Sequence, residues 1–83
     1  MLRYATVIQW DEIGDEVTNL PLTLDDSLSD EELLEEVCRL THCLAWNLRG
    51  AMSTYNVKML VLTSGRGHDA TVQIVWGEPM REG

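Results

Sequence analysis

Histidine and cysteine, the side chains best suited to nucleophilic catalysis or zinc binding, are few in this chain. His42 stands beside Cys43, His68 stands beside Asp69, and Cys38 precedes His42 by about one helical turn. Adjacent residues of a helix or strand point in different directions, so neither adjacent pair forms a nucleophile with its base. A zinc site would need two further ligands that no spacing supplies. We therefore expect neither an enzyme nor a zinc protein.

Carboxylates are the most abundant groups with potential chemistry. The segments DEIGDE (residues 11–16) and LDDSLSD (residues 24–30) carry the oxygen ligands that calcium prefers. Neither segment has the regular alternation and closing glutamate of an EF-hand loop, so we expect no metal. The connector SGRGHD (residues 64–69) could offer backbone amides and Arg66 to a phosphate, but a hairpin turn explains its glycines as well. The sequence therefore predicts no cofactor.

The acidic residues are concentrated in the first half of the chain. Residues 1–38 contain eleven acidic residues and one basic residue, a net charge of −10, whereas residues 39–83 contain three acidic and five basic residues, a net charge of +2. Asp30, Glu31 and Glu32 suit the first turn of a helix, where the helix dipole favours negative charge by about 0.3–1 kcal/mol each. The remaining acids need another explanation.

Eight acidic residues outside that first turn are candidates for binding a partner. They would form one surface if the turn between the first two strands and the segment before the helix lie at the same end of the molecule. Such a surface repels nucleic acid and membranes and attracts a basic protein surface. The alternative is a solvated face that only keeps the protein in solution. The candidate residues are Asp11, Glu12, Asp15, Glu16, Asp25, Asp26, Glu35 and Glu36.

Trp46 forms a second candidate site, an interface, together with Arg39, Cys43 and Gly50. On a helix these four residues recur at intervals of four, three and four, in a row almost opposite the apolar stripe. A large aromatic side chain among small residues, with an arginine nearby, is typical of a binding hot spot or a contact between helices. The alternative is that the segment 11–28 wraps the helix and covers Trp46.

The apolar pattern indicates which elements position these residues. Residues 2–10 alternate as a strand, and a turn at DEIGDE leads to a second strand over residues 16–24. Pro21 lacks an amide donor, so we expect this second strand to lie at an edge of the sheet or to break into a loop there. Residues 56–64 and 69–76 are rich in β-branched and aliphatic side chains and predict another hairpin, followed by a short tail over residues 77–83.

The start of a helix is the most specific local pattern. Ser29 is placed as the N-cap, and Glu32 completes a capping box. Leu28 and Leu33 occupy the two positions of a hydrophobic staple. Apolar residues then recur every three or four positions as far as Tyr55, which predicts one long amphipathic helix over about residues 30–53.

Together these elements predict an α+β fold, a single domain over residues 1–83. Its two-layer ββαββ arrangement has a four-stranded antiparallel sheet with the long helix on one face. The segment 57–64 carries apolar residues on both faces, so a single helix leaves an apolar face uncovered, which Ala5, Val7 and Val75 could join. A second copy, a partner, or the amino-terminal hairpin folded over the sheet would bury that face.

We expect a soluble, cytoplasmic protein without a leader, a membrane span or a disulfide. The preferred hypothesis is a small acidic inhibitor or adaptor, without catalysis, whose acidic face engages a basic site of a partner protein, such as a nucleic-acid-binding site, with no direct contact to nucleic acid or membrane. In size and charge the chain resembles the small acidic proteins with which phages block host defence. The alternative is a homo-oligomeric scaffolding domain, most simply a homodimer, that assembles through the sheet face and the Trp46 face.

Overall fold

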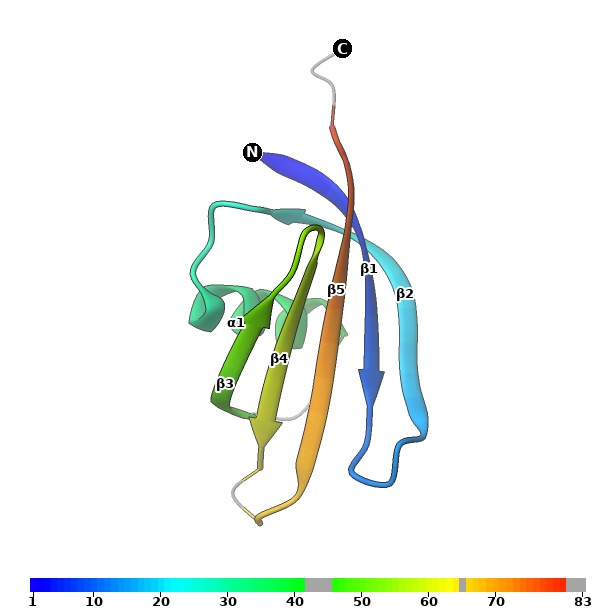
Figure 1. The fold of residues 1–83 in the computed structure, drawn as a ribbon, viewed down its shortest axis with the longest axis vertical. Helices are drawn as coiled ribbons and strands as arrows, with labels where there is room; N and C mark the ends of the chain where they lie inside the picture. Colours follow the sequence, from blue (N-terminus) through cyan, green and yellow to red (C-terminus); the bar gives the residue numbers. More distant parts are fainter. Residues whose placement is uncertain (42–45, 65, 81–83) are drawn as a thin grey trace.

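The computed structural model describes residues 1–41, 46–64 and 66–80, with the side chain of Thr41 left out. Within these residues the chain forms five strands and one helix (Figure 1). Their order along the chain is β1 (Leu2–Trp10), β2 (Glu16–Asp25), α1 (Asp30–Thr41), β3 (Asn47–Ser53), β4 (Val57–Thr63) and β5 (Asp69–Pro79). The strands form one antiparallel sheet in the order β2-β1-β5-β4-β3.

The predicted ββαββ fold with four strands and one long helix is therefore wrong. The helix ends at Thr41, and the second half of the predicted helix contains a fifth strand, β3, which pairs with β4. Gly50 disfavours a helix there by about 1 kcal/mol relative to alanine. Pairing as a strand gives the backbone of β4 a partner along what would otherwise be an open edge of the sheet.

A β-bulge explains why β3 looks helical in sequence. The register shifts between Leu48 and Gly50, so that Leu48 lies opposite Leu62 and Ala51 lies opposite Leu60. Leu62 and Leu60 both point into the core, and Leu48 and Ala51 pack against it. The extra residue at the bulge thus puts two positions three apart on the same face of a strand. That spacing is the one expected for successive apolar residues of a helix.

Two predicted local signals, one within β2 and one at the start of α1, are confirmed. Pro21 lies in an edge strand, where a missing amide donor costs no sheet hydrogen bond. At the helix start, the Glu32 carboxylate accepts a hydrogen bond from the Ser29 amide at 3.1 Å, and the Ser29 hydroxyl accepts one from the Glu32 amide at 3.3 Å. This is the predicted capping box, and the helix begins at Asp30 as expected.

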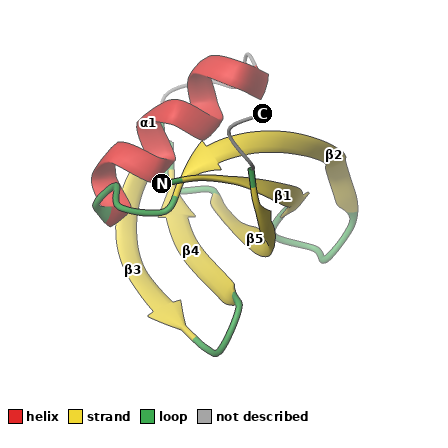
Figure 2. Cartoon of the chain, turned by 90° about the horizontal axis from the view of Figure 1, so that it is seen from above, coloured by secondary structure: helices red, strands yellow, loops and turns green. Residues whose placement is uncertain are grey.

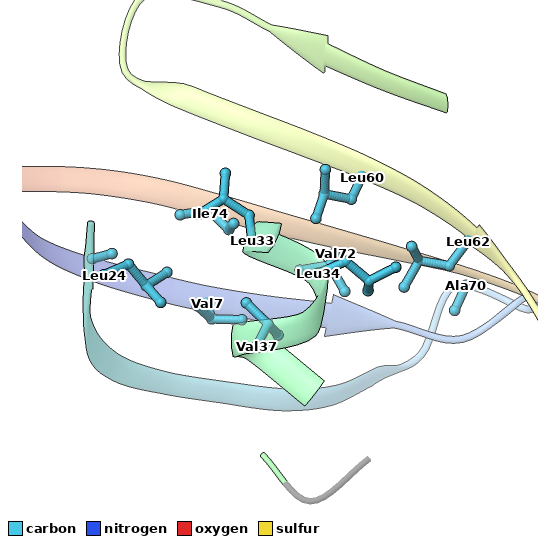
Figure 3. Packing of buried hydrophobic residues seen from close by; sticks show 11 residues of the cluster. Val7, Leu24, Leu33, Leu34, Val37, Leu60, Leu62, Ala70, Val72 and Ile74 are labelled. Atoms are coloured by element: carbon cyan, nitrogen blue, oxygen red, sulfur yellow. The ribbon is translucent and has the colours of Figure 1, made fainter. Parts of the chain in front are cut away.

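The core lies between α1 and one face of the sheet, which we call the inner face. Leu33, Leu34 and Val37 of the helix are buried against the side chains of β1, β4 and β5 (Figure 3). Ala5 and Val7 belong to this core, at 4% and 0% exposure, so their predicted place on the uncovered face is wrong. Both faces of β1 are apolar, and the alternation of a strand does not say which of its faces is buried.

The carboxyl end of the chain is also more regular than predicted. Residues 77–79, expected in a loose tail, continue β5 alongside β1, where Arg3 lies opposite Pro79. The register shifts between Arg3 and Ala5, which leaves Gly77 close to Tyr4. A Cβ atom at position 77 would lie 3.1 Å from the Tyr4 carbonyl oxygen, a tight contact that favours glycine at this bulge.

Candidate binding surfaces

The face of the sheet opposite α1 is the largest surface in the molecule that needs an explanation, and we call it the open face. Figure 2 shows α1 on one side of the twisted sheet and no other described element on the opposite side. The strand registers place there the side chains that alternate with the buried ones. Its apolar members are Leu2, Tyr4, Ile8, Trp10, Pro21, Met52, Val57, Met59, Val61 and Val75.

The amino-terminal hairpin does not cover this face, although the sequence left that possibility open. β1 lies between β2 and β5, so the hairpin extends the sheet sideways instead of folding over it. Large side chains remain in contact with solvent as a result: Tyr4 is 56% exposed and Met52 is 62% exposed. Contiguous apolar surface of this kind is unusual on a monomer and marks an interaction site.

The open face is also uncharged across its middle. Its polar members along the described strands are Thr6, Asn19, Thr23, Asn47, Thr63, Thr71 and Gln73. One basic residue, Arg49 at the bulge of β3, pairs with Asp69 at the start of β5, with Nη1 and Oδ1 3.3 Å apart. Acidic residues in register with this face stand only at strand ends, where Asp25 is opposite Leu2, Glu16 is opposite Trp10 and Asp69 is opposite Thr63. Apart from the Arg49–Asp69 ion pair near one end of β4, a protein with a net charge of −8 thus carries few charged side chains on this face.

A shallow hollow interrupts the open face near one end of β1. Its volume is about 210 Å³, and its walls include Tyr4 and Thr6 of β1, Pro21 of β2 and Val75 of β5. The volume is below the roughly 300 Å³ at which pockets for small-molecule ligands begin. The hollow is therefore better suited to a side chain of a docked protein than to a cofactor.

The acids between β1 and β2 are used to build the turn. The Asp11 carboxylate accepts hydrogen bonds from the amides of Ile13, at 3.1 Å, and Asp15, at 2.8 Å. Glu12 reaches the neighbouring β4–β5 connection, where its carboxylate lies 3.1 Å from Nδ1 of His68. Glu16 accepts a hydrogen bond from the side chain of Asn19 at 3.1 Å. Three of these four carboxylates therefore have a partner within the protein.

Asp25 and Asp26 close the other end of β2. The Asp25 carboxylate lies 2.9 Å from the terminal ammonium of Met1 and accepts hydrogen bonds from the amide and hydroxyl of Ser27. These bonds hold the pKa of Asp25 well below its usual value, with the Ser27 hydroxyl as the largest cause, and the two aspartates raise the pKa of the terminal amine. Asp26 also lies 3.7 Å from the guanidinium of Arg3.

The structure does not bring the two acidic groups of the β1–β2 hairpin together. Asp11, Glu12, Asp15 and Glu16 lie at one end of β2, and Asp25 and Asp26 lie at the other (Figure 1). The 10 residues of β2 separate them by about 30 Å at 3.3 Å per residue. The condition for a single acidic surface, that these two segments lie at the same end of the molecule, is therefore not met, because β2 connects them.

The remaining two candidate acids lie on α1 and differ from one another. The Glu36 carboxylate forms an ion pair with Arg39, which lowers the pKa of Glu36 and raises the pKa of Arg39. Glu35 has no ion pair within residues 1–41, 46–64 and 66–80, and it borders a groove together with Glu31. Of these two candidate acids, Glu36 is therefore neutralised within the helix and Glu35 is not.

The predicted interface row of Arg39, Cys43, Trp46 and Gly50 does not exist as a helix face. Only Arg39 lies in α1, whereas Trp46 directly precedes β3 and Gly50 lies within β3, in register with Val61 on the open face. Cys43 lies outside the described residues, as does His42. Trp46 is half-buried and packs against the edge of the core, and the segment 11–28 does not wrap it, because most of that segment forms β2 at the far edge of the sheet.

Trp46 nevertheless takes part in a groove that the sequence did not reveal. The groove has a volume of about 260 Å³ and runs between α1 and the start of β3, lined by Glu31, Leu34, Glu35, Cys38 and Trp46. The spacing of Glu31 and Glu35, four apart on one helix, is a sequence signal that two carboxylates share a side of α1. The missing information was the position of Trp46, which depends on where the helix ends.

The candidate groups for chemistry stay apart where they are described. His68 contacts Glu12 at the surface, with both side chains about half exposed. Among the residues whose positions are described, no group of three or more His, Cys, Asp or Glu side chains could hold a metal ion. In the described part of the chain, the helix is too short and too polar to cross a membrane.

Comparison of the chain with protein-family models, with curated proteins and with solved structures finds no match.

Proposed function

We propose that this protein is a non-catalytic interaction domain that self-associates through its open face. The single observation that carries this proposal is a largely apolar sheet face, with its few charged side chains at strand ends and at the β3 bulge, that no described element covers. Burying Ile8, Met59 and Val61 against another apolar surface would remove their side chains from water, which is favourable by roughly 25 cal/mol per Å². A second copy of the same chain supplies a matching surface without requiring a different molecule.

The open face is close in size to the smallest specific protein interfaces. Five strands about 4.8 Å apart span about 19 Å, and seven residues at 3.3 Å each span about 23 Å, which gives a face of roughly 440 Å² before its corrugation is counted. Specific interfaces begin at about 500 Å² of accessible surface per partner. Two such sheets can pack face to face about 10 Å apart, as in a β-sandwich.

The edges of the sheet are less suitable for assembly than its face. β2, at one edge, carries Pro21 in its middle, and β3, at the other, is interrupted by a bulge beside Gly50. Proline and bulges are the features with which proteins prevent an exposed edge from pairing with another strand. These features favour association of the open faces over addition of strands at the edges.

Charge gives this proposal a sharp test. Each copy carries a net charge of −8, so two copies repel each other at a distance while their open faces attract at contact. Salt screens that repulsion, with a Debye length of about 8 Å at 0.15 M. Self-association is therefore expected to strengthen as salt rises from 0.05 to 0.5 M, whereas binding to a basic partner weakens under the same change.

Sedimentation velocity across protein concentration and salt measures this directly. We expect a monomer–dimer equilibrium with a dissociation constant on the order of 10–100 μM, typical of a small interface, that tightens severalfold with salt. A sedimentation coefficient that stays at the monomer value up to about 1 mM at high salt would exclude self-association, since it corresponds to less than about 4 kcal/mol of attraction.

A second candidate function is an inhibitor or adaptor that engages a basic site of a partner protein. The specific observation in its favour is the groove beside α1, where Glu31 and Glu35 flank an apolar floor. Because the other candidate acids are separated by the length of β2, this proposal is limited to the helix side of the molecule. A pull-down with a Glu31→Gln/Glu35→Gln variant as control tests it, and equal recovery of a basic partner by both proteins would exclude it.

A further inference from the structure

The groove between α1 and Trp46 combines two kinds of surface in a small volume. Leu34, which is 4% exposed, and the half-buried Cys38 are apolar members, and the indole of Trp46 is another. Glu31 and Glu35 supply two carboxylates one helical turn apart, about 5–6 Å between their Cβ atoms. An apolar surface next to two negative charges suits a ligand with an apolar stem and a cationic head.

The two groove carboxylates differ from their neighbours on the helix. Asp30 pairs with Lys58 at 2.7 Å, Glu32 bonds with Ser29, and Glu36 pairs with Arg39. Glu31 and Glu35 form neither an ion pair nor a side-chain hydrogen bond with the rest of the described chain. Three acids of α1 are therefore accounted for by the fold, and the two beside the groove are not.

We propose that this groove receives the side chain of an arginine from a basic segment of a partner protein. The methylene groups would lie on Leu34 and Cys38, and the guanidinium would meet the carboxylates of Glu31 and Glu35. Arginine is favoured over lysine because its planar head can bond carboxylates in a bidentate way and stack on an aromatic ring. A cation placed against the indole face is attracted by the negative potential of the ring, which favours a guanidinium beside Trp46.

The size and charge of the groove restrict its occupant. Its volume of about 260 Å³ accommodates a side chain but is below the roughly 300 Å³ of the smallest typical ligand pockets. Residues 1–38 carry a net charge of −10, which raises the local concentration of a cationic segment and disfavours any anionic ligand. This inference rests on the second candidate function and is independent of self-association through the open face.

A Trp10→Phe/Trp76→Phe protein makes the experiment selective, because Trp46 is then the only tryptophan. The probe is an acetylated, amidated (Arg-Gly)4 peptide, titrated in 0.05 M salt at a protein concentration where sedimentation shows monomer. The matched control peptide has citrulline at every arginine position, which keeps the shape and removes the charge. We expect a change in Trp46 emission with the arginine peptide and at least tenfold weaker binding of the citrulline peptide.

Matched variants locate the site. Glu31→Gln/Glu35→Gln in this background removes both groove charges and should weaken the binding of the arginine peptide at least tenfold. Asp15→Asn/Glu16→Gln also removes two negative charges, but at the turn between β1 and β2. It should change the affinity for the arginine peptide less than twofold. Equal losses in the two variants, equal binding of both peptides, or no binding at all would each overturn the proposal. Self-association measured separately would be unaffected by any of these results.

Discussion

The two faces of the sheet are built from the same kinds of residue but have opposite surroundings. On β4, Leu60 and Leu62 of the inner face are 0% and 1% exposed under α1, whereas Met59 and Val61 of the open face have no covering element among the described residues. The sequence of the strand is apolar on both sides. The difference therefore lies in how many layers one short chain can supply, and it supports the proposal that the second apolar face packs against another molecule.

The largest effect that tests this difference comes from shortening neighbouring side chains on β4. Leu60→Ala should lower the free energy of unfolding by about 2–5 kcal/mol, because it removes a fully buried side chain and leaves a cavity. Met59→Ala should cost less than about 1 kcal/mol in the monomer, since that side chain already contacts solvent. Urea unfolding at a concentration where the protein is monomeric measures both. Equal losses would mean that the open face is covered.

A smaller effect is expected from the helix start, because the capping box holds the element that covers the inner face. Ser29→Ala removes the hydroxyl that accepts a hydrogen bond from the Glu32 amide. The change should lower the free energy of unfolding by about 1 kcal/mol. Ser53→Ala at the exposed end of β3 is the matched control, with an expected change within about 0.5 kcal/mol. Thermal unfolding followed by circular dichroism compares the two. If both variants unfold like the parent, the capping box contributes nothing measurable.

The contribution of the sheet's rim to stability should depend on pH, because Asp25 and the terminal amine titrate there. The apolar side chains of the open face do not titrate. The folded pKa of Asp25 lies below its unfolded value, so its contribution to stability is full above about pH 4 and is lost as pH falls. The terminal amine has a raised pKa, so its contribution is full below about pH 8 and is lost as pH rises. The pair therefore stabilises the fold between these limits.

Asp25→Asn removes this pair. The melting temperature of the variant should therefore change less with pH than that of the parent, at both ends of that window. Asp15→Asn removes a carboxylate at the other end of β2 that makes no side-chain hydrogen bond within the described residues, and should leave the pH profile of the parent unchanged. The effect is expected to be modest, because Asp25 and Met1 are both solvent-exposed. A profile that is the same for the parent and Asp25→Asn would show that the pair is not formed in solution.

Local patterns predicted local structure well. The side chains of Ser29 and Glu32 can form a capping box, which identifies the start of a helix within four residues. Pro21 lacks an amide donor, which favours an edge position for its strand. Both features depend on chemistry contained in a few neighbouring residues. They could therefore be identified without knowledge of the tertiary structure.

The predictions that were wrong concern features that depend on contacts between residues distant in sequence. The bulge beside Gly50 gives β3 the apolar spacing of a helix, and only its pairing with β4 shows that it is a strand. The choice of inner face on β1 is equally invisible, since Val7 and Ile8 are both apolar and only the position of α1 decides which is buried. The groove beside Trp46 was missed because the segment that contains Trp46 was predicted to be helical. A tryptophan on the helix could not face a groove at the side of that same helix.

The most direct test of self-association through the open face is sedimentation velocity of Met59→Lys compared with Thr54→Lys. Both variants add one positive charge, but the first adds it in the middle of the open face and the second in the β3–β4 turn. In the monomer the lysine at position 59 can extend its amine into solvent, whereas in the dimer that charge would be buried, at a cost of several kcal/mol. We predict that Met59→Lys weakens the dimer at least tenfold and that Thr54→Lys does not weaken it. Dimers of equal strength in both variants would contradict an interface on this face.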